Sequence, residues 1–365
     1  MTLLAGLTGR RESCMTKGRD LLVAPHDPVE HGATLANKVA FLSLPDSYPD
    51  APSRVEAVET HMSWVFLTDR FAHKLKKPVR YEFLDFSSLE ARRRSCQDEI
   101  RLNRRLAPKV YIAAVPLVIN AEGGLQLDGE GEPVDWMVRM HRLPSGRMLD
   151  HAIRLGTVQI GELRAIARLL AEFYKDAIRV AVPPSAFRRR LANAISENRR
   201  ELKSPEFGLN TDRVKAVCVA LGKLLVDDSP LFDQRMRLGC VVEGHGDLRP
   251  EHVYLGPAPA VIDCLEFNRE FRILDWVDEL AYLAMECERL GSADTGREIL
   301  ETCCRELDDT PPVKLIDFYK AYRALLRARL AILHLRDADV RDPEKWRRRT
   351  TEYLGLAESH ARRLH

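Results

Sequence analysis

The sequence changes character after Leu143-Pro-Ser-Gly146, and this change constrains the fold more than any other feature. Before it, apolar and polar residues alternate as they do in half-buried strands. After it, apolar residues recur every three to four positions, as they do on the buried face of a helix. A mainly β segment of about a hundred residues, followed by a mainly α segment of about two hundred, predicts an α+β protein with two lobes.

The first segment predicts a β-hairpin, a helix and a second β-hairpin. Asp69 and Arg70 form the turn of the first hairpin, and a stretch rich in glycine and acidic residues forms that of the second. A serine precedes the long helix and Pro108 follows it, as expected for its two ends. The expected elements are a helix at 35–42, strands at 55–58, 63–68 and 71–76, a helix at 88–106, and strands at 110–119 and 134–140.

The second segment is predicted to be helical apart from two short strands around the turn Gly256-Pro257. We expect an N-lobe at residues 35–141 and a C-lobe at 142–365, after a poorly ordered extension at 1–34 that shows no periodicity. The expected elements are helices at 157–178, 184–203, 211–226 and 230–237, strands at 252–255 and 260–263, and helices at 275–290, 293–307, 312–336 and 342–363.

Composition limits the kinds of partner. The 56 lysines and arginines and 54 acidic residues give a net charge of +2, which argues against a general affinity for nucleic acid. No run approaches the ~18 apolar residues needed to span a bilayer. The eight cysteines are scattered without paired spacing, which fits a reducing compartment. We therefore expect a cytoplasmic protein that binds a small molecule rather than nucleic acid or a membrane.

Two aspartates in the second segment indicate phosphoryl transfer. Asp247 lies in Gly244-His-Gly-Asp-Leu-Arg-Pro-Glu-His-Val-Tyr-Leu255, and Asp263 ends the apolar run Ala260-Val-Ile262. This chemistry needs a group that orients or accepts the proton of the attacking hydroxyl, and carboxylates for the metal on the phosphates. Asp247 fits the first role and Asp263 the second, with Glu266 as a possible further oxygen ligand. Either aspartate alone is more often a turn or cap residue; it is their combination that carries the signal.

The motifs "HGDLRPEH", "VIDCLEF" and "RILDWVDELAYL" resemble those of the aminoglycoside phosphotransferase and choline kinase-like family, a branch of the protein-kinase-like fold. The N-terminal half, with "SWVFL" and "KLKKPV", is similar to a poorly characterised bacterial branch, so the resemblance covers about residues 37–365. It implies a bilobal fold, with a small antiparallel-sheet N-lobe carrying one helix and a large, mainly helical C-lobe. Asp275 and Glu279 match the family's later helix start, with Glu in place of a second Asp.

The resemblance also implies a nucleotide site. It maps the lysine that contacts the phosphates onto Lys74, while Lys76 has the same strand parity and remains an alternative. Glu99, on the following helix, is the expected ion-pair partner, although such residues are usually solvated. The segment around Met140 resembles the hinge whose backbone binds adenine. The loop that should cover the phosphates includes Ser63 but no glycine.

His252 departs from the family pattern, which has asparagine at this position. Asparagine offers a metal ion an oxygen, whereas histidine offers a nitrogen. Mg²⁺ prefers oxygen ligands, and Mn²⁺ accepts imidazole more readily. Two alternatives follow. Either His252 ligates the metal, or it packs and forms hydrogen bonds while Asp263 and Glu266 hold the metal.

Together these features predict a phosphotransferase that uses ATP or GTP with Mg²⁺ or Mn²⁺. Its acceptor would be a hydroxyl of a small molecule such as an aminoglycoside, an amino sugar or an amino alcohol. The alternative is a nucleotide-binding pseudokinase or regulatory protein with little turnover. His252 and the glycine-free loop favour this alternative, and the set Lys74, Glu99, Asp247 and Asp263 opposes it.

Overall fold

The computed structural model describes residues 33–81, 84–337, 340 and 342–364. These residues form two compact units: the first runs to Pro144 and includes Ile262–Asn268, and the second contains Ser145–Val261 and the residues from Arg269 onward. The segment Ile262–Asn268, which the sequence placed in the C-lobe, therefore groups with the first unit. The expected extension at 1–34 lies outside the described residues except for Ala33 and Thr34.

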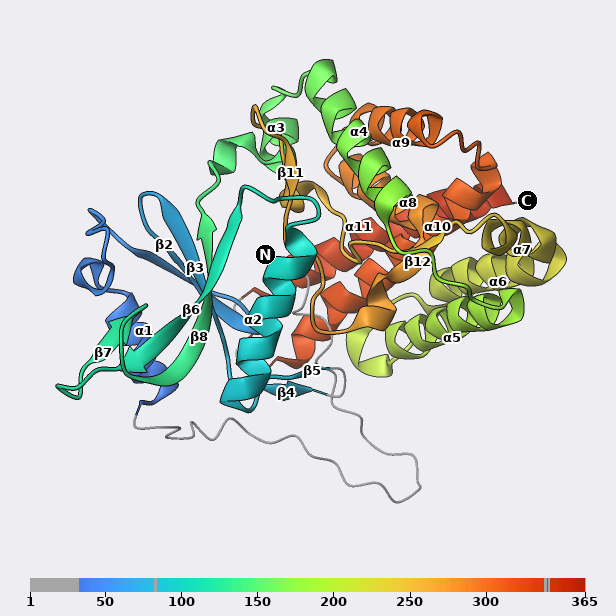
Figure 1. Cartoon of the computed structure of the whole chain (residues 1–365). Coiled ribbons are helices and arrows are strands. Elements are labelled where there is room, and N and C mark those ends of the chain that lie inside the picture. Colours follow the sequence, from blue (N-terminus) through green and yellow to red (C-terminus); the bar gives the residue numbers. More distant parts are fainter. Residues whose placement is uncertain (1–32, 82–83, 338–339, 341, 365) are drawn as a thin grey trace. The chain divides into compact units, whose positions relative to one another are not determined.

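A six-stranded antiparallel sheet forms the first unit, with the strand order β1-β2-β3-β8-β6-β7 (Figure 1). Both predicted hairpins are present, and the turn of the second contains the additional short strand β7, because Leu125 and Leu127 alternate with a polar residue. The strands are β1 (Glu56–Glu59), β2 (Ser63–Leu67), β3 (Phe71–Lys76), β6 (Tyr111–Ile119), β7 (Leu125–Leu127) and β8 (Glu132–His141), with β4 (Arg80–Tyr81) and β5 (Leu84–Asp85) forming a separate pair.

Two helices pack within the first unit. Helix α1 (Leu35–Leu42) joins the sheet in an apolar core that includes Phe66, Leu75 and Met137. Helix α2 (Leu89–Asn103) starts at Ser88, whose hydroxyl accepts a hydrogen bond from the amide of Ala91, and it packs against β6 and β8 (Figure 1). Unlike α1, α2 buries several polar side chains, which must therefore find partners inside the unit.

Helix α2 has a buried polar face. Arg92, Glu99 and Asn103 are buried along one side of the helix, and they recur at the spacing of helical turns. Arg92 is paired with Asp135 of β8, with 2.8 Å between Nε and Oδ1. Glu99 and Asn103 instead contact other parts of the unit.

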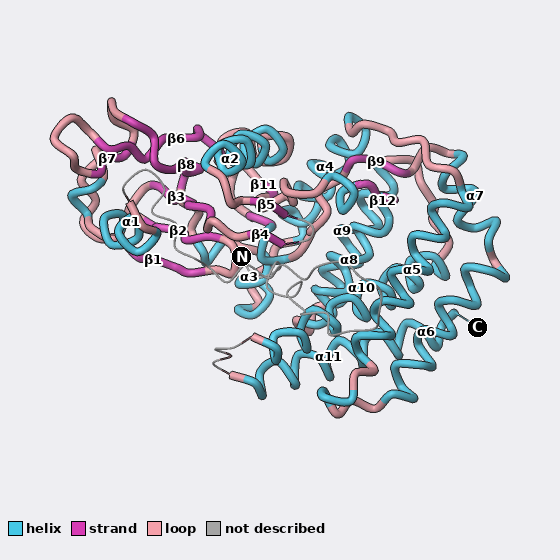
Figure 2. Tube along the Cα trace, turned by 90° about the horizontal axis from the view of Figure 1, so that it is seen from below, coloured by secondary structure: helices cyan, strands magenta, loops and turns pink. Residues whose placement is uncertain are grey.

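The second unit is mainly helical (Figure 2). Its predicted helices are all present, with ends shifted by a few residues. The sequence missed the seven-residue helix α3 and the short strands β9 and β12. The elements are α3 (Leu149–Leu155), α4 (Ile160–Asp176), α5 (Pro184–Leu202), α6 (Thr211–Asp227), α7 (Ser229–Arg237), β9 (Val241–Glu243), β10 (Val253–Tyr254), β11 (Ala260–Val261), β12 (Ile273–Asp275), α8 (Trp276–Arg289), α9 (Ala293–Glu306), α10 (Val313–Leu333) and α11 (Pro343–Ala361).

Helix α8 forms the centre of the second unit. Residues 276–287 are all buried, and α8 packs against α9, α10 and α11. Strand β12 lies directly before α8 and pairs with β9. This pairing fixes the end of β9, where the loop at 244–252 begins. Within the described part of the chain, the longest helices carry too many charges to cross a membrane.

Candidate active site

Strand β3 and helix α2 bring two lysines to one glutamate. Lys74 and Lys76 lie on the same face of β3 because side chains alternate along a strand. Lys74 Nζ lies 2.9 Å from Glu99 Oε1, and Lys76 Nζ lies 2.6 Å from Glu99 Oε2. The expected contact between Lys74 and Glu99 is therefore present, and Lys76 shares it. The lysines differ in access: the Lys74 side chain is 13% exposed and that of Lys76 is fully buried.

Two further carboxylates complete this cluster in the first unit. Lys74 Nζ lies 3.0 Å from Asp263 Oδ1, and Lys76 Nζ lies 2.5 Å from Glu266 Oε1. Burial alone would lower the pKa of Lys74, but the carboxylates of Asp263 and Glu99 outweigh it and raise that pKa well above its usual range. Burial would likewise raise the pKa of Glu99, yet the two lysines lower it. Lys74 and Glu99 therefore stabilise each other's charged form.

Asp263 and Glu266 have different surroundings in this cluster. The side chain of Asp263 is 24% exposed, whereas that of Glu266 is 6% exposed and faces the fully buried Lys76. A metal ion would have to compete with a buried ammonium group for Glu266, but with the more accessible Lys74 for Asp263. The arrangement thus fits Asp263 as a metal ligand better than Glu266.

The other two residues assigned to the nucleotide lie in regular backbone. Ser63 begins β2, and its N–H donates to Thr60 Oγ1 at 3.0 Å, so the turn between β1 and β2 is closed on itself. Met140 lies within β8, between Ala72 of β3 and Tyr111 of β6. Ser63 pairs with Lys76 in the β2–β3 ladder, and the nucleotide-binding roles of Ser63 and Met140 remain predictions.

In the second unit, Asp247 lies in a buried loop between β9 and β10. Its side chain is 1% exposed. Asp247 Oδ1 accepts hydrogen bonds from Arg249 Nε at 3.2 Å and from the hydroxyl of Tyr282, on α8, at 3.3 Å. These two donors fix the orientation of the carboxylate, as expected for a group that has to meet a substrate hydroxyl in one geometry.

The side chain of Glu279, on α8, contacts the backbone of the same loop. It accepts hydrogen bonds from the backbone N–H of Gly246 and, at 2.9 Å, from the hydroxyl of Tyr174. A Cβ atom at Gly244 would lie 2.7 Å from Glu279 Oε2, so a residue with a side chain there would have to displace the Glu279 carboxylate. Burial raises the pKa of Glu279. The glutamate that stands in place of the family's second aspartate therefore supports the backbone just before Asp247.

Asp275, the other residue of that helix motif, caps α8. Its Oδ1 accepts a hydrogen bond from the N–H of Val277 at 3.1 Å, and its carboxylate pairs with both Nε and Nη2 of Arg235. A capping aspartate with a bidentate arginine partner fixes the start of α8. It contributes to the position of Tyr282 and Glu279 farther along that helix.

The structure favours the second alternative for His252, that of packing and hydrogen bonding. The ring is 1% exposed, Nδ1 lies 2.9 Å from the carbonyl oxygen of Asp247, and Nε2 lies 3.2 Å from Arg249 Nη2. Because an arginine nitrogen can only donate, Nε2 accepts and Nδ1 carries the proton that goes to the carbonyl. Both ring nitrogens are thus engaged by the loop itself.

We expect His252→Asn to leave the ratio of Mn²⁺- to Mg²⁺-supported turnover unchanged and to lower stability instead. Losing the acceptor for the buried Arg249 should cost about 1–3 kcal/mol. The measurements are thermal unfolding and turnover with each metal, with His151→Asn on the exposed side of α3 as the control. A shift of the ratio toward Mg²⁺ in His252→Asn alone would instead show that His252 ligates the metal.

Sequence reasoning missed the role of Arg249. This residue is fully buried, and its guanidinium contacts Asp247, Glu251 and His252. Burial alone would lower the pKa of Arg249, but Asp247 and Glu251 raise it. Its position two residues after Asp247 could have suggested a contact between the two side chains, because an arginine that is buried in a loop needs acceptors nearby.

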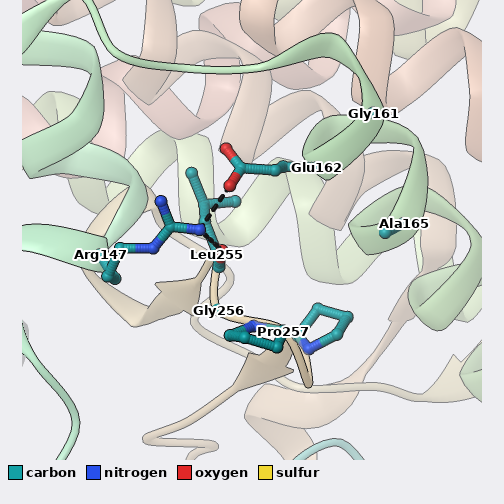
Figure 3. Close-up of a pocket in the computed structure, with 8 residues that line it drawn as sticks. Arg147, Gly161, Glu162, Ala165, Leu255, Gly256 and Pro257 are labelled. Carbon is teal, nitrogen blue, oxygen red and sulfur yellow. Dashed lines mark hydrogen bonds and ion pairs between the residues drawn. The ribbon is translucent and has the colours of Figure 1, made fainter.

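Among the described residues, histidines, cysteines and carboxylates do not gather in groups of three or more that could hold a metal ion by themselves. A separate cavity of about 250 Å³ lies in the second unit, where the β10–β11 turn faces the first turn of α4 (Figure 3). Its polar residues, Arg147 and Glu162, are paired with each other. The cavity contains none of the predicted site residues.

Comparison with solved structures supports the expected kinase-like fold, and comparison of sequences finds relatives without a named activity. No protein-family model matches the chain. An uncharacterised protein of Mycobacterium tuberculosis is 35% identical over 290 residues, which are 78% of this chain and 56% of that protein, so the chain spans little more than half of its length. A solved choline kinase from Cryptosporidium parvum superposes with a TM-score of 0.51 at 10% identity, over 88% of this chain and 94% of the kinase.

Proposed function

We propose that this chain, which has the protein-kinase-like fold of the solved choline kinase, is a phosphotransferase that uses ATP or GTP. Its acceptor would be a hydroxyl of a small molecule such as an aminoglycoside, an amino sugar or an amino alcohol. The observation that carries the proposal is the contact of Lys74 with both Glu99 and Asp263. It places a cation, its anchor and a partly exposed carboxylate together, as phosphate binding requires.

The first unit supplies the groups for the nucleotide. Lys74 would contact the donor phosphates, and Glu99 keeps its ammonium group in place from the buried side. Asp263 would hold a Mg²⁺ or Mn²⁺ ion, which would neutralise charge on the phosphates when bound. Mg²⁺ is commonly bound through one or two carboxylates plus substrate phosphates rather than by a full protein cage. A single accessible carboxylate beside the lysine therefore fits this requirement.

The second unit supplies the group for the acceptor. Asp247 would orient the attacking hydroxyl and accept its proton as the bond to phosphorus forms. Arg249 and Tyr282 hold Oδ1 of this carboxylate, and Glu279 fixes the backbone before it. These contacts define one orientation of Asp247 before any substrate binds, which reduces the ordering that the reaction requires.

One observation favours the alternative of a nucleotide-binding protein with little turnover. The turn between β1 and β2 lacks glycine, and its Thr60 side chain occupies the N–H of Ser63. Such a turn has fewer backbone donors to offer to a phosphate than a glycine-rich loop has. A weakly held phosphate would reduce turnover while leaving nucleotide binding through Lys74 intact.

The test is ADP or GDP formation by the purified protein with ATP or GTP, and with Mg²⁺ or Mn²⁺. The acceptor panel contains aminoglycosides, amino sugars, choline-like alcohols and nucleosides. We expect nucleoside diphosphate formation that depends on one acceptor class. Nucleotide binding without acceptor-dependent turnover would support the alternative, and a protein that binds neither nucleotide would remove both proposals.

A further inference from the structure

The backbone of Asp263 has an unusual conformation. Its φ angle is +63°, in the left-handed region that residues with a side chain seldom adopt. Aspartate tolerates this region better than most residues, but surrounding structure must still hold it there. Strand β11 ends at Val261, so the following amides no longer have strand partners and need other acceptors.

Tyr111 satisfies the amide of Asp263. It begins β6, is 3% exposed, and its hydroxyl oxygen accepts a hydrogen bond from the N–H of Asp263 at 3.1 Å. A hydroxyl oxygen can accept this bond without introducing a charge.

Asn103 satisfies the next amide. This fully buried residue lies one helical turn after Glu99 on α2. Its Oδ1 accepts a hydrogen bond from the N–H of Cys264 at 2.9 Å, and its Nδ2 donates to the backbone carbonyl of Glu99 at 2.9 Å. Asn103 thus connects the helix turn that carries Glu99 to the backbone directly after Asp263.

We propose that Tyr111 and Asn103 are positioning residues that fix the left-handed backbone of Asp263 and so hold its carboxylate beside Lys74. The inference rests on the proposed function for the role of Asp263 as a metal ligand. Two consecutive amides are held by side chains from two different elements of the same unit. The bond from Cys264 to Asn103 is buried, and the bond from Asp263 to Tyr111 is partly buried. Lys74 and Asp263 can then meet at 3.0 Å without either backbone having to be ordered by the substrate.

Tyr111→Phe tests the inference most directly, because it removes only the hydroxyl. Tyr48→Phe is the matched control: Tyr48 is also buried in the first unit, and its hydroxyl donates to the carbonyl of Leu42 at 2.5 Å, outside the cluster. The measurements are hydrogen–deuterium exchange of peptides spanning 258–268 and Mn²⁺ affinity in the presence of ADP, read from the electron paramagnetic resonance of free Mn²⁺.

In Tyr111→Phe we expect faster exchange at Asp263 and about tenfold weaker Mn²⁺ binding, since outer-shell partners of a metal ligand typically contribute 10–100-fold to affinity. Tyr48→Phe should change neither quantity. Asn103→Leu should accelerate exchange at Cys264 and weaken Mn²⁺ binding, whereas Asn103→Asp keeps an acceptor oxygen and should restore protection of that amide.

Different results would overturn the two proposals. Unchanged exchange in Tyr111→Phe, or Mn²⁺ affinity equal to that of Tyr48→Phe, would reject the positioning role while leaving the phosphotransferase proposal in place. A parent protein that binds neither ADP nor Mn²⁺ would reject the proposed function and, with it, the role given to Asp263.

Discussion

Replacing Asp247 by asparagine is expected to lower acceptor-dependent turnover by about 10²–10⁴-fold, the usual contribution of a positioned general base. The amide keeps the shape of the side chain and can still accept a hydrogen bond from Arg249, but it cannot take up the hydroxyl proton. Because the proposed contacts of the nucleotide are Lys74 and Asp263 rather than Asp247, nucleotide affinity should stay nearly unchanged.

The measurement is steady-state turnover together with nucleotide affinity from a binding titration. Asp233→Asn is the matched control, since Asp233 lies in the same unit and pairs with Arg188 at 2.9 Å, away from the loop. Equal turnover in Asp247→Asn and in the parent would remove Asp247 from its proposed role. A loss of nucleotide affinity in Asp247→Asn would place it in the nucleotide site instead.

The two lysines of β3 are expected to respond differently to the same substitution. Lys74→Met should lower turnover by about 10²–10³-fold, the usual effect of removing one group that stabilises developing charge. Lys76 is fully buried between Glu99 and Glu266. Lys76→Met should therefore destabilise the protein by about 3–5 kcal/mol, because it leaves buried carboxylates without a counter-charge.

Chemical denaturation and turnover, measured on both variants, separate these effects. Lys77→Met is the control, because Lys77 directly follows β3 and pairs with Glu59, an exposed residue at the end of β1. A stable Lys76→Met variant with strongly reduced turnover, beside an active Lys74→Met variant, would assign the phosphate contact to Lys76. That outcome would assign the family's phosphate-contacting lysine to the position two residues later on β3.

The sequence alone predicted the elements and the charged residues of the cluster. Alternation along β3 put Lys74 and Lys76 on one face, and the order of strand, helix and loop brought Glu99 and Asp263 into consideration. The assignment of Lys74 and Glu99 came from the resemblance to the kinase-like family, whereas the positions of the elements depend on short-range periodicity, which a sequence displays directly. The division into a β-rich and a helical segment is confirmed for the same reason.

Tertiary structure decided how these charges are divided among partners. Only packing shows that Glu266 faces a buried lysine, that both nitrogens of His252 are engaged within its loop, and that Arg249 contacts Asp247. Likewise, the side chains of Tyr111 and Asn103 reach the backbone of Asp263 and Cys264 across more than 150 positions of sequence. Hydrogen-bond partners of this kind depend on distance and direction in space, and neither periodicity nor residue type encodes them.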